Sequence, residues 1–379
     1  AWLSFGKWDC GTYAGEVTAV VDGVGDGVRL NLQVAEGGPL LPVQKDVTLD
    51  EVKELQPSLY PVVLSFYDEA YLPYVKAVNR LMRTYTNRND SKAAYYITLA
   101  ASEKLFGENG FYTQEKKEIR EKITEGYGLL PRLEYGEGDL YFSALVCALA
   151  PELLSESKKT ELIQEFEFVL SAETIADERV LTTALFGLAA LGQPVYADLN
   201  YVAAVAGEYS TEAKWMLAAA HAYLGDCGTA AELYDSLTTG VMTSRDNELY
   251  IKGSTTEETI KYTAYALLTA SLVRKTDAEG LYRYLSTHTS TLDLYQLEQA
   301  AYLKYFYPMD AKAAKFSWTV GEKTESIVLK PGQVYTLSLS KRDWNALQLT
   351  EEEGDVRIRA QYLGSVAEAL EGTQSSDKV

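Results

Sequence analysis

The sequence predicts a mainly α-helical protein in which about six helical hairpins close into a ring, an α/α toroid, beside a small β domain. Two observations predict this fold class. A helix rich in small apolar residues recurs six times between residues 46 and 310, and a more charged, amphipathic helix lies between most of its copies. Segments that alternate apolar and polar residues, as β-strands do, lie on both sides of this region.

The first segment, residues 1–45, contains a hairpin signal. The stretch GEVTAVVDGVGDGVRLNLQVAEG from Gly15 alternates apolar and polar residues on either side of a glycine-rich turn. Its glycines Gly23, Gly25 and Gly27 resemble part of a dinucleotide-binding loop, but such a loop must open a helix, and these glycines connect two strands. We therefore interpret the segment as a β-hairpin.

Helical periodicity begins near Thr48 and lasts to about Pro308, so we assign residues 46–310 to the helical ring. The spacing between successive small-residue helices varies from 33 to 49 residues, whereas a strict solenoid keeps its period. Two kinds of helix at irregular spacing favour an inner circle packed on both sides and an outer circle facing water. The six small-residue helices begin near Tyr95, Leu140, Val180, Ala213, Tyr262 and Tyr295.

The last part of the chain, residues 311–370, predicts about four or five strands. KFSWTV, ESIVLK, VYTLSLS and VRIRAQYL alternate with period two, and turns are expected at Pro331-Gly332 and at the acidic EEEGD from Glu351. Because chain termini usually lie close together, we expect residues 1–45 and 311–370 to form one β domain into which the helical ring is inserted. Residues 371–379 are expected to be a tail, or the start of a linker.

The composition excludes several classes of function. The chain has 35 basic and 54 acidic residues, a net charge of -19, and no Lys/Arg cluster, so nucleic acid and anionic membrane surfaces are poor partners. No apolar run reaches the roughly 18 residues of a membrane-spanning helix. The N-terminus shows no leader, so we expect a mature form or a cut chain. Cys10, Cys147 and Cys227 are too far apart for a disulfide framework or a zinc site, and we expect no cofactor and no metal ion.

Histidine chemistry is tightly constrained because the chain has two histidines. His221 lies in the Ala-rich stretch AKWMLAAAHAYL, where a hydrogen-bonded core residue is a better interpretation than a base or a ligand. His288, within STHTST, is interpreted as a loop residue. Neither HExxH, GxSxG nor a P-loop pattern is present, so zinc catalysis and serine-hydrolase chemistry are not expected.

Carboxylates remain as candidate catalytic groups. The loop EYGEGD places Glu134, Glu137 and Asp139 at the start of an inner helix, and a ring of hairpins can hold two acids across a central cleft for glycoside hydrolysis. The alternative is structural, with Asp139 as the N-cap of the helix from Leu140 and the acids favoured by its dipole. With 54 acids in the chain, we favour the structural interpretation.

Taken together, these segments resemble the thioester-domain region of the bacterial α2-macroglobulin and complement C3 family. GEVTAVVDGVGDGVRLNLQV resembles the strands that lead into that domain, DLYFSALVCAL and EETIKYTAYALLTASLV resemble inner helices, and FSWTVGEKTESIVLKPGQVYTLSLS resembles the β return. The resemblance covers nearly the whole chain. It implies an α/α toroid of the terpenoid cyclase-like kind, inserted into a CUB-like β domain, in an extracytoplasmic protein such as a bacterial surface protein.

One family feature is missing. The reactive segment of the family is Gly-Cys-Gly-Glu-Gln near the first toroid helix, and its Cys and Gln side chains form a thioester. Here that neighbourhood is VKELQPSLYPVVLSFYDEAY, where Gln56 has no cysteine beside it. The resemblance therefore implies a member without covalent capture and carries over no catalytic residue. The upstream β domains and the bait region are also missing, as in a fragment of a larger protein.

Three functions follow as hypotheses. The first is a non-enzymatic binding or trapping module, whose partner is a protein, such as a protease, or the remaining domains of a longer chain. The second is a toroid enzyme that acts on a polysaccharide through paired carboxylates, with Glu134, Glu137 and Asp139 as candidates. The third is a helical-repeat interaction scaffold, since AKWMLAAAHAYLGDCGTAAELYDSL resembles one tetratricopeptide unit.

Overall fold

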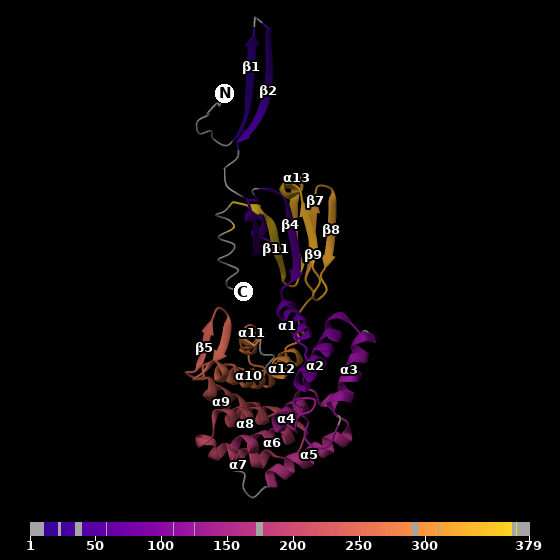
Figure 1. The fold of residues 1–379 in the computed structure, drawn as a ribbon, viewed down its shortest axis with the longest axis vertical. Helices are drawn as coiled ribbons and strands as arrows, with labels where there is room; N and C mark the ends of the chain where they lie inside the picture. The colour runs from indigo at the N-terminus through magenta and orange to yellow at the C-terminus, as the bar shows by residue number, and fades with distance from the viewer. Residues whose placement is uncertain are drawn as a thin grey trace.

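The computed structural model describes residues 11–21, 24–34, 40–57, 59–108, 110–124, 126–171, 177–289, 295–309, 311–365 and 369. The protein is mainly α-helical with a smaller β part, as the sequence predicts. Figure 1 shows three regions along the long axis, namely a β-hairpin at one end, a pair of β-sheets in the middle and a helical region at the other end. Cys10 and the predicted tail, residues 371–379, lie outside the described residues.

The N-terminal hairpin is formed by β1 (Gly11–Val21) and β2 (Val24–Val34), which pair antiparallel along their whole length. The hairpin prediction is confirmed, although Gly25 and Gly27 lie within β2 and not in the turn. Among the described strands, β1 and β2 pair with each other only, and Figure 1 shows them projecting away from the other sheets. This hairpin therefore shares no sheet with the other described strands, because alternation identifies strands but not the sheet that contains them, and its place in the β domain stays a prediction.

The β domain contains two antiparallel sheets. The first has the order β3 (Leu41–Val47), β11 (Val356–Gly364), β4 (Leu59–Asp68) and β9 (Tyr335–Leu339). The second has the order β10 (Leu347–Glu353), β7 (Lys315–Val320) and β8 (Lys323–Val328), and the short helix α13 (Lys341–Ala346) precedes β10. Because β11 pairs with β3 on one side and β4 on the other, both ends of the chain contribute to one sheet.

The two sheets share one apolar core. The rings of Phe66 on β4 and Phe316 on β7 stack with their centroids 4.3 Å apart, and Ile358 on β11 is fully buried beside them. Each strand contributes alternate residues to this core, as in β-sandwiches generally. The middle of Figure 1 is therefore a small β-sandwich assembled from segments far apart in the sequence.

Two details of the sequence-based strand assignment are corrected. The helical periodicity assigned from Thr48 is wrong over Leu59–Asp68, because this segment is strand β4, with Val62, Leu64 and Phe66 buried in alternation. The turn expected at EEEGD is shorter, since β10 continues to Glu353 and the chain turns at Gly354. A short apolar run flanked by polar residues fits either helix or strand, and sheet pairing decided this one.

The described part of the helical region contains twelve helices, which form two sets. All six predicted small-residue helices are present, and they are buried on most sides: α2 (Asn89–Phe106), α4 (Leu140–Leu149), α6 (Glu178–Ala190), α8 (Thr211–Tyr223), α10 (Thr256–Leu272) and α12 (Gln296–Tyr305). The other six bury a narrower face: α1 (Leu72–Arg83), α3 (Gly110–Ile123), α5 (Glu156–Ser171), α7 (Tyr196–Val205), α9 (Cys227–Thr238) and α11 (Ala278–His288).

The small-residue helices contact one another in succession from α2 to α12, and α12 also contacts α2. Their alanines allow this close approach. Ala144, Ala184, Ala219, Ala264 and Ala300, one from each of five of these helices, are fully buried. The outer helices follow the amphipathic pattern, as α9 shows by burying Ala230, Tyr234 and Thr238 at intervals of four residues. No helix among the described residues is long and apolar enough to cross a membrane.

A second hairpin interrupts the helices between α9 and α10. It consists of β5 (Met242–Arg245) and β6 (Glu248–Ile251), and Asp246 and Asn247 at its turn both have positive φ. This conformation is typical of two-residue hairpin turns and favours Asn and Asp. The prediction of uninterrupted helical periodicity missed this hairpin, since its strands of four residues each are too short to alter the pattern of the surrounding helices.

The chain crosses between the β-sandwich and the helices twice, and one buried carboxylate binds both crossings. Asp68 at the end of β4 accepts hydrogen bonds from the amides of Ala70 and Ala314, each at 3.0 Å. The hydroxyl of Tyr74 on α1 donates to the carbonyl of Leu303 on α12 at 2.7 Å. The entry and the exit of the helical region are thereby joined by residues more than 200 positions apart.

Candidate functional site

The amino ends of the small-residue helices carry a series of acidic side chains. Asp139 and Asp177 are the N-caps of α4 and α6, and Glu212 and Glu298 lie in the first turns of α8 and α12. Acids at these positions are favoured by the positive end of the helix dipole. A cavity of about 240 Å³ lies at this end of the helices and is lined by Asp139, Asp177, Glu212, Arg179, Tyr141 and Tyr265, among others.

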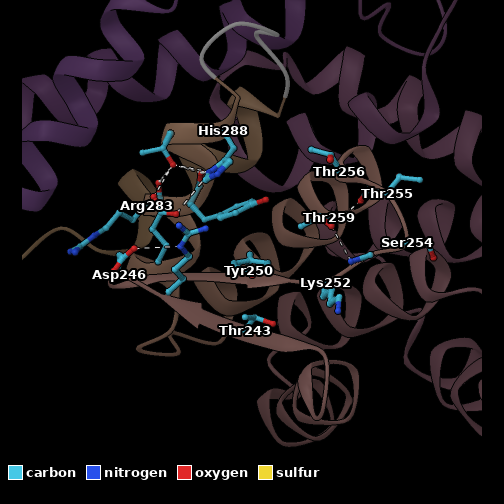
Figure 2. A pocket seen from close by; sticks show the side chains of 15 residues that line it. Thr243, Asp246, Tyr250, Lys252, Ser254, Thr255, Thr256, Thr259, Arg283 and His288 are labelled. Atoms are coloured by element: carbon cyan, nitrogen blue, oxygen red, sulfur yellow. Dashed lines mark hydrogen bonds and ion pairs between the residues drawn. The ribbon is translucent and has the colours of Figure 1, made fainter. Parts of the chain in front are cut away.

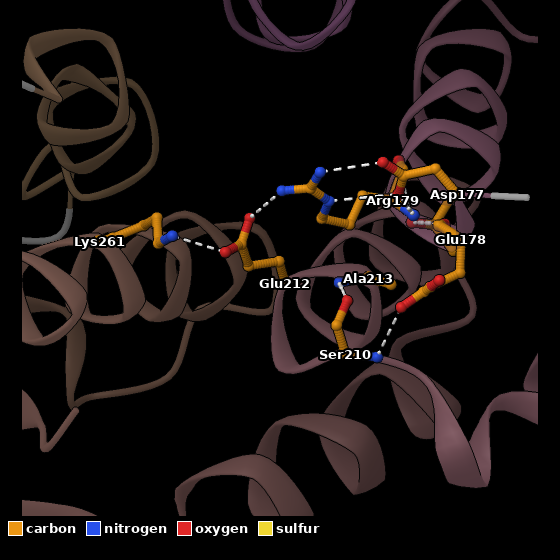
Figure 3. A network of polar contacts seen from close by, with 8 residues as sticks. Asp177, Glu178, Arg179, Ser210, Glu212, Ala213 and Lys261 are labelled. Carbon is orange, nitrogen blue, oxygen red and sulfur yellow. Dashed lines mark hydrogen bonds and ion pairs between the residues drawn. The ribbon is translucent and has the colours of Figure 1, made fainter. Parts of the chain in front are cut away.

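Cations occupy the spaces between these acids. Arg179 binds Asp177 at 2.9 Å and reaches Glu212 at 3.5 Å, and Glu212 also pairs with Lys261 of α10 at 2.5 Å. Figure 3 shows this chain of ion pairs across the ends of three helices. Hydrogen bonds from Arg179 hold the pKa of Asp177 below its ordinary value. The carboxylates at the cavity rim are therefore engaged with cations of the protein.

Glu298 lies in a different environment. Its side chain is buried, and its Oε1 accepts a hydrogen bond of 2.9 Å from the hydroxyl of Tyr141. Burial raises the pKa of the Glu298 carboxyl, and the charge of Arg132 opposes this effect in part. Burial and the neighbouring Glu298 also raise the pKa of Tyr141 well above its ordinary value. A buried carboxyl with a raised pKa is a known sign of functional sites, and its partner Tyr141 lines the cavity.

Sequence reasoning missed Glu298. It appears in YQLEQAAYLKYF as a charged residue inside an apolar, small-residue helix, and that was the signal available in the sequence. Its partner Tyr141 is 157 positions away, so the pair cannot be recognised from local patterns.

The acidic loop that was singled out from the sequence separates into two parts. Asp139 is the N-cap of α4, because its carboxylate accepts a hydrogen bond from the amide of Phe142 at 2.8 Å, and it lies 3.1 Å from Arg132. The capping interpretation of Asp139 is confirmed. Glu134 and Glu137 are exposed in the loop closed by the bridge between Pro131 and Gly138. Their catalytic role remains a prediction.

Both histidines lie in helices and contact other protein side chains. His221 is fully buried in α8, and its Nδ1 lies 3.1 Å from Asp226, so the interpretation as a hydrogen-bonded core residue is confirmed. Burial opposes ionisation of Asp226, but hydrogen bonds from Thr229 and His221 hold its pKa below the ordinary value. The loop assignment of His288 is wrong. It is the last residue of α11, and its ring stacks on Tyr284 one turn earlier.

The two cysteines that the structure describes offer no exposed pair. Cys147 is fully buried in α4, where burial raises the pKa of its thiol to about 12, and Cys227 is the exposed first residue of α9. Gln56, which was considered as the glutamine of a thioester, is exposed in the connection before β4. Among the described residues, no group of three or more His, Cys, Asp or Glu side chains is arranged to hold a metal ion.

No protein-family model matches the chain, and no curated protein matches it in sequence. Several solved structures are similar to it in fold. They are bacterial α2-macroglobulins. These structures come from the family that the sequence resembles.

Three of these structures define the extent of the similarity. Native α2-macroglobulin from Escherichia coli, spanning domain MG7 to the C-terminus, has a TM-score of 0.47 at 13% identity, with 94% of this chain and 63% of that chain covered. The cryo-EM reconstruction of the native E. coli protein gives a TM-score of 0.47 at 14% identity over 94% and 25% of the two chains. Salmonella α2-macroglobulin reacted with methylamine gives 0.45 at 12% identity over 94% and 26%. The chain spans less than two thirds of each.

Proposed function

We propose that this chain is a non-enzymatic, protein-binding module of a macroglobulin-like bacterial protein. In this proposal the twelve helices form an α/α toroid inserted into the β-sandwich, and the module works outside the cytoplasm, at the cell surface, in the periplasm or after secretion. Its partner is a protein, either a protease or the remaining domains of a longer chain. Trapping would follow a shift of the toroid against the β-sandwich after cleavage elsewhere in the protein.

One observation supports the non-enzymatic part of the proposal most directly. At the cavity rim Asp139, Asp177 and Glu212 are paired with Arg132, Arg179 and Lys261 at distances from 2.5 to 3.5 Å. General acid–base catalysis on a glycoside needs one carboxylate free to attack or activate water and a second held protonated. Paired carboxylates at helix amino ends serve capping and dipole compensation instead.

The mode of capture is non-covalent in this proposal. The sequence contains no Gly-Cys-Gly-Glu-Gln segment, and of the two described cysteines Cys147 is fully buried within α4. A buried thiol with a raised pKa is a poor nucleophile and a poor thioester donor. Binding would therefore rest on surface complementarity and be reversible.

The direct test is to measure binding of the whole chain to proteases. Serine, cysteine, aspartic and metalloproteases, each in an active and an active-site-blocked form, are passed over the immobilised chain, and complexes are confirmed by size-exclusion chromatography with light scattering. A reversible complex with at least one protease is the expected result. The remaining domains of the longer protein, added as a separate chain, provide the second arm, and absence of binding in both arms would contradict the proposal.

The second candidate function, hydrolysis of a polysaccharide, is favoured by one observation. Tyr141, which lines the cavity together with Tyr265, donates a hydrogen bond to the buried carboxyl of Glu298. A reducing-end assay on neutral and acidic polysaccharides tests it. Activity that is lost in Asp139→Asn or Glu298→Gln, and is kept in Glu121→Gln at an exposed position of α3, would establish the enzyme and replace our proposal.

A further inference from the structure

A second cavity lies at the first turn of α10 and shares no lining residue with the cavity at the ion-paired helix ends. It has a volume of about 860 Å³ and is enclosed by the β5–β6 hairpin, by α11 and by the first turn of α10. Figure 2 shows its walls, with Tyr250 at the centre, Thr255 and Thr259 on the side of α10, and Arg283 and His288 on the side of α11. Its size lies within the usual range for small-ligand sites.

The hairpin presents two chemically different faces. Met242, Leu249 and Ile251 pack against the helical core. The alternate residues Thr243 and Tyr250, which are cross-strand neighbours, line the cavity together with Arg245 and Glu248, the next such pair. The hairpin thus covers the core with its apolar side and directs only hydrogen-bonding side chains into the cavity.

Stacked rings hold one wall of the cavity in place. The ring of Tyr250 stacks on Tyr284 at 4.8 Å, and Tyr284 stacks on His288 at 4.0 Å. Thr287 donates to the carboxylate of Glu248 at 2.8 Å and so links α11 to β6 a second time. A ligand would therefore meet a preformed wall, which lowers the cost of ordering on binding.

The lining chemistry favours a saccharide over a peptide. None of the described residues that line the cavity has an aliphatic side chain, and six of them are serine or threonine. Peptide recognition generally uses apolar pockets for side chains. Hydroxyl groups, by contrast, both donate and accept hydrogen bonds, as the hydroxyls of a sugar require.

The charges of the cavity favour an acidic ligand. Lys252 is exposed and has no ion-pair partner among the described residues, and the Arg245 side chain is 79% exposed with a single contact of 3.5 Å to Asp246. Arg283 uses one terminal nitrogen for Glu279 and keeps other N–H groups available. The cavity lining therefore carries three cations with spare hydrogen-bonding capacity and two carboxylates. Asp246 lies 3.5 Å from Arg245, and Glu248 accepts a hydrogen bond from Thr287, so cations outnumber acids in this lining although the net charge of the chain is -19. Figure 2 places Lys252 and Arg283 on opposite sides of it.

We propose that this cavity binds an acidic oligosaccharide of at least two sugar units, whose acid groups lie at Lys252 on one side and at Arg245 and Arg283 on the other. The sugar hydroxyls bond to the threonine and tyrosine hydroxyls between them. Charge-assisted hydrogen bonds, bidentate at arginine, supply the selectivity for acids. The acid group is a carboxylate or a sulfate, and the experiment below distinguishes the two. This inference does not depend on the protein-binding proposal, and its test is separate.

The test is calorimetric titration of the full chain with four probes of similar length. They are an oligogalacturonate, which carries carboxylates, a heparin-derived oligosaccharide, which carries sulfates, neutral maltohexaose, and hexaglutamate as an acidic peptide. Binding of one or both acidic saccharides is expected, with no measurable binding of maltohexaose or hexaglutamate. Failure of both acidic saccharides at millimolar concentration overturns the proposal, as does equal affinity for either control probe.

Variants then locate the site. Lys252→Ala and Arg245→Ala, both at exposed positions, should each weaken binding about tenfold, since each removes one charge-assisted contact. Thr243→Val keeps the shape of the side chain, removes its hydroxyl, and should weaken binding severalfold. Lys122→Ala, at an exposed lysine on α3, makes the same change in net charge and should leave the affinity unchanged. An equal loss in Lys122→Ala and Lys252→Ala would mean general electrostatics and overturn the proposal.

Discussion

The β5–β6 hairpin packs against α11 at one glycine, Gly280. This contact predicts both the sign and the size of the change in the free energy of unfolding when the glycine is replaced. A Cβ atom on Gly280 would lie 2.7 Å from Cγ and 3.1 Å from Cβ of Leu249 on β6. Contacts this short to atoms near the backbone cannot be relieved by rotating the leucine alone. We therefore expect Gly280→Ala to push the hairpin away from α11.

The size follows from two opposing effects. Overpacking of this kind costs about 1–3 kcal/mol. Replacement of glycine by alanine in a helix stabilises it by about 1 kcal/mol. The net effect should be a loss of about 0–2 kcal/mol, which corresponds to a fall in Tm of up to ~8 °C for a helical region of this size.

Gly228 on α9 provides a matched control. The nearest heavy atom to a Cβ there, Oδ1 of Asp226, lies 4.0 Å away, so Gly228→Ala meets no obstacle and should be neutral or stabilising by at most about 1 kcal/mol. Urea denaturation followed by circular dichroism at 222 nm compares the two variants. In a Leu249→Ala background Gly280→Ala should also become harmless. If Gly280→Ala instead stabilises the protein as Gly228→Ala does, Leu249 of the hairpin does not pack against Gly280 of α11.

Three further predictions concern the helix ends and the domain crossings. Asp139→Ala should cost about 1 kcal/mol by removing the cap of α4, and Asp139→Asn much less, as measured by urea denaturation; equal effects would argue against capping. Because burial raises the folded-state pKa of Glu298, its ionisation costs stability as pH rises through that value, so Glu298→Gln should be more stable than wild type at pH 7. The stability difference between Glu298→Gln and wild type should shrink at acid pH. If Glu298→Gln is less stable than wild type at pH 7, the folded protein favours the ionised form of Glu298. Asp68→Ala leaves the amides of Ala70 and Ala314 without an acceptor, and should cost about 1–3 kcal/mol and speed proteolysis at the crossings; an unchanged digestion rate would refute this role.

The helices were predictable because the residues that specify each of them lie close together in the sequence. Runs such as LYFSALVCALA are apolar on all sides and rich in small residues, and the residues Phe142 to Leu149 are all buried. A helix of this composition must be surrounded by others. Asp139 was likewise recognisable as a cap, since capping depends on residues within one turn of the helix start.

The errors fall where pairing partners decide the structure. LYPVVLSFYD was assigned to the helical region, yet it is strand β4 because β11 and β9 lie on its two sides. The place of the first hairpin in the β domain stays a prediction, and its strands pair with each other only among the described residues. Strand signals identify an extended segment, but the choice of neighbour depends on contacts between segments remote in sequence.

The two candidate sites also depend on contacts between residues that are distant in the sequence. Glu298 acquires its raised pKa from burial beside Tyr141, and the cavity behind the β5–β6 hairpin arises where residues 243–259 meet residues 283–288. Composition, helix texture and capping therefore determined the mainly helical class, the six buried helices and the role of Asp139. Tertiary packing decided the β-sandwich, the hairpin positions and both cavities, because burial and charge pairing depend on which distant residues come together.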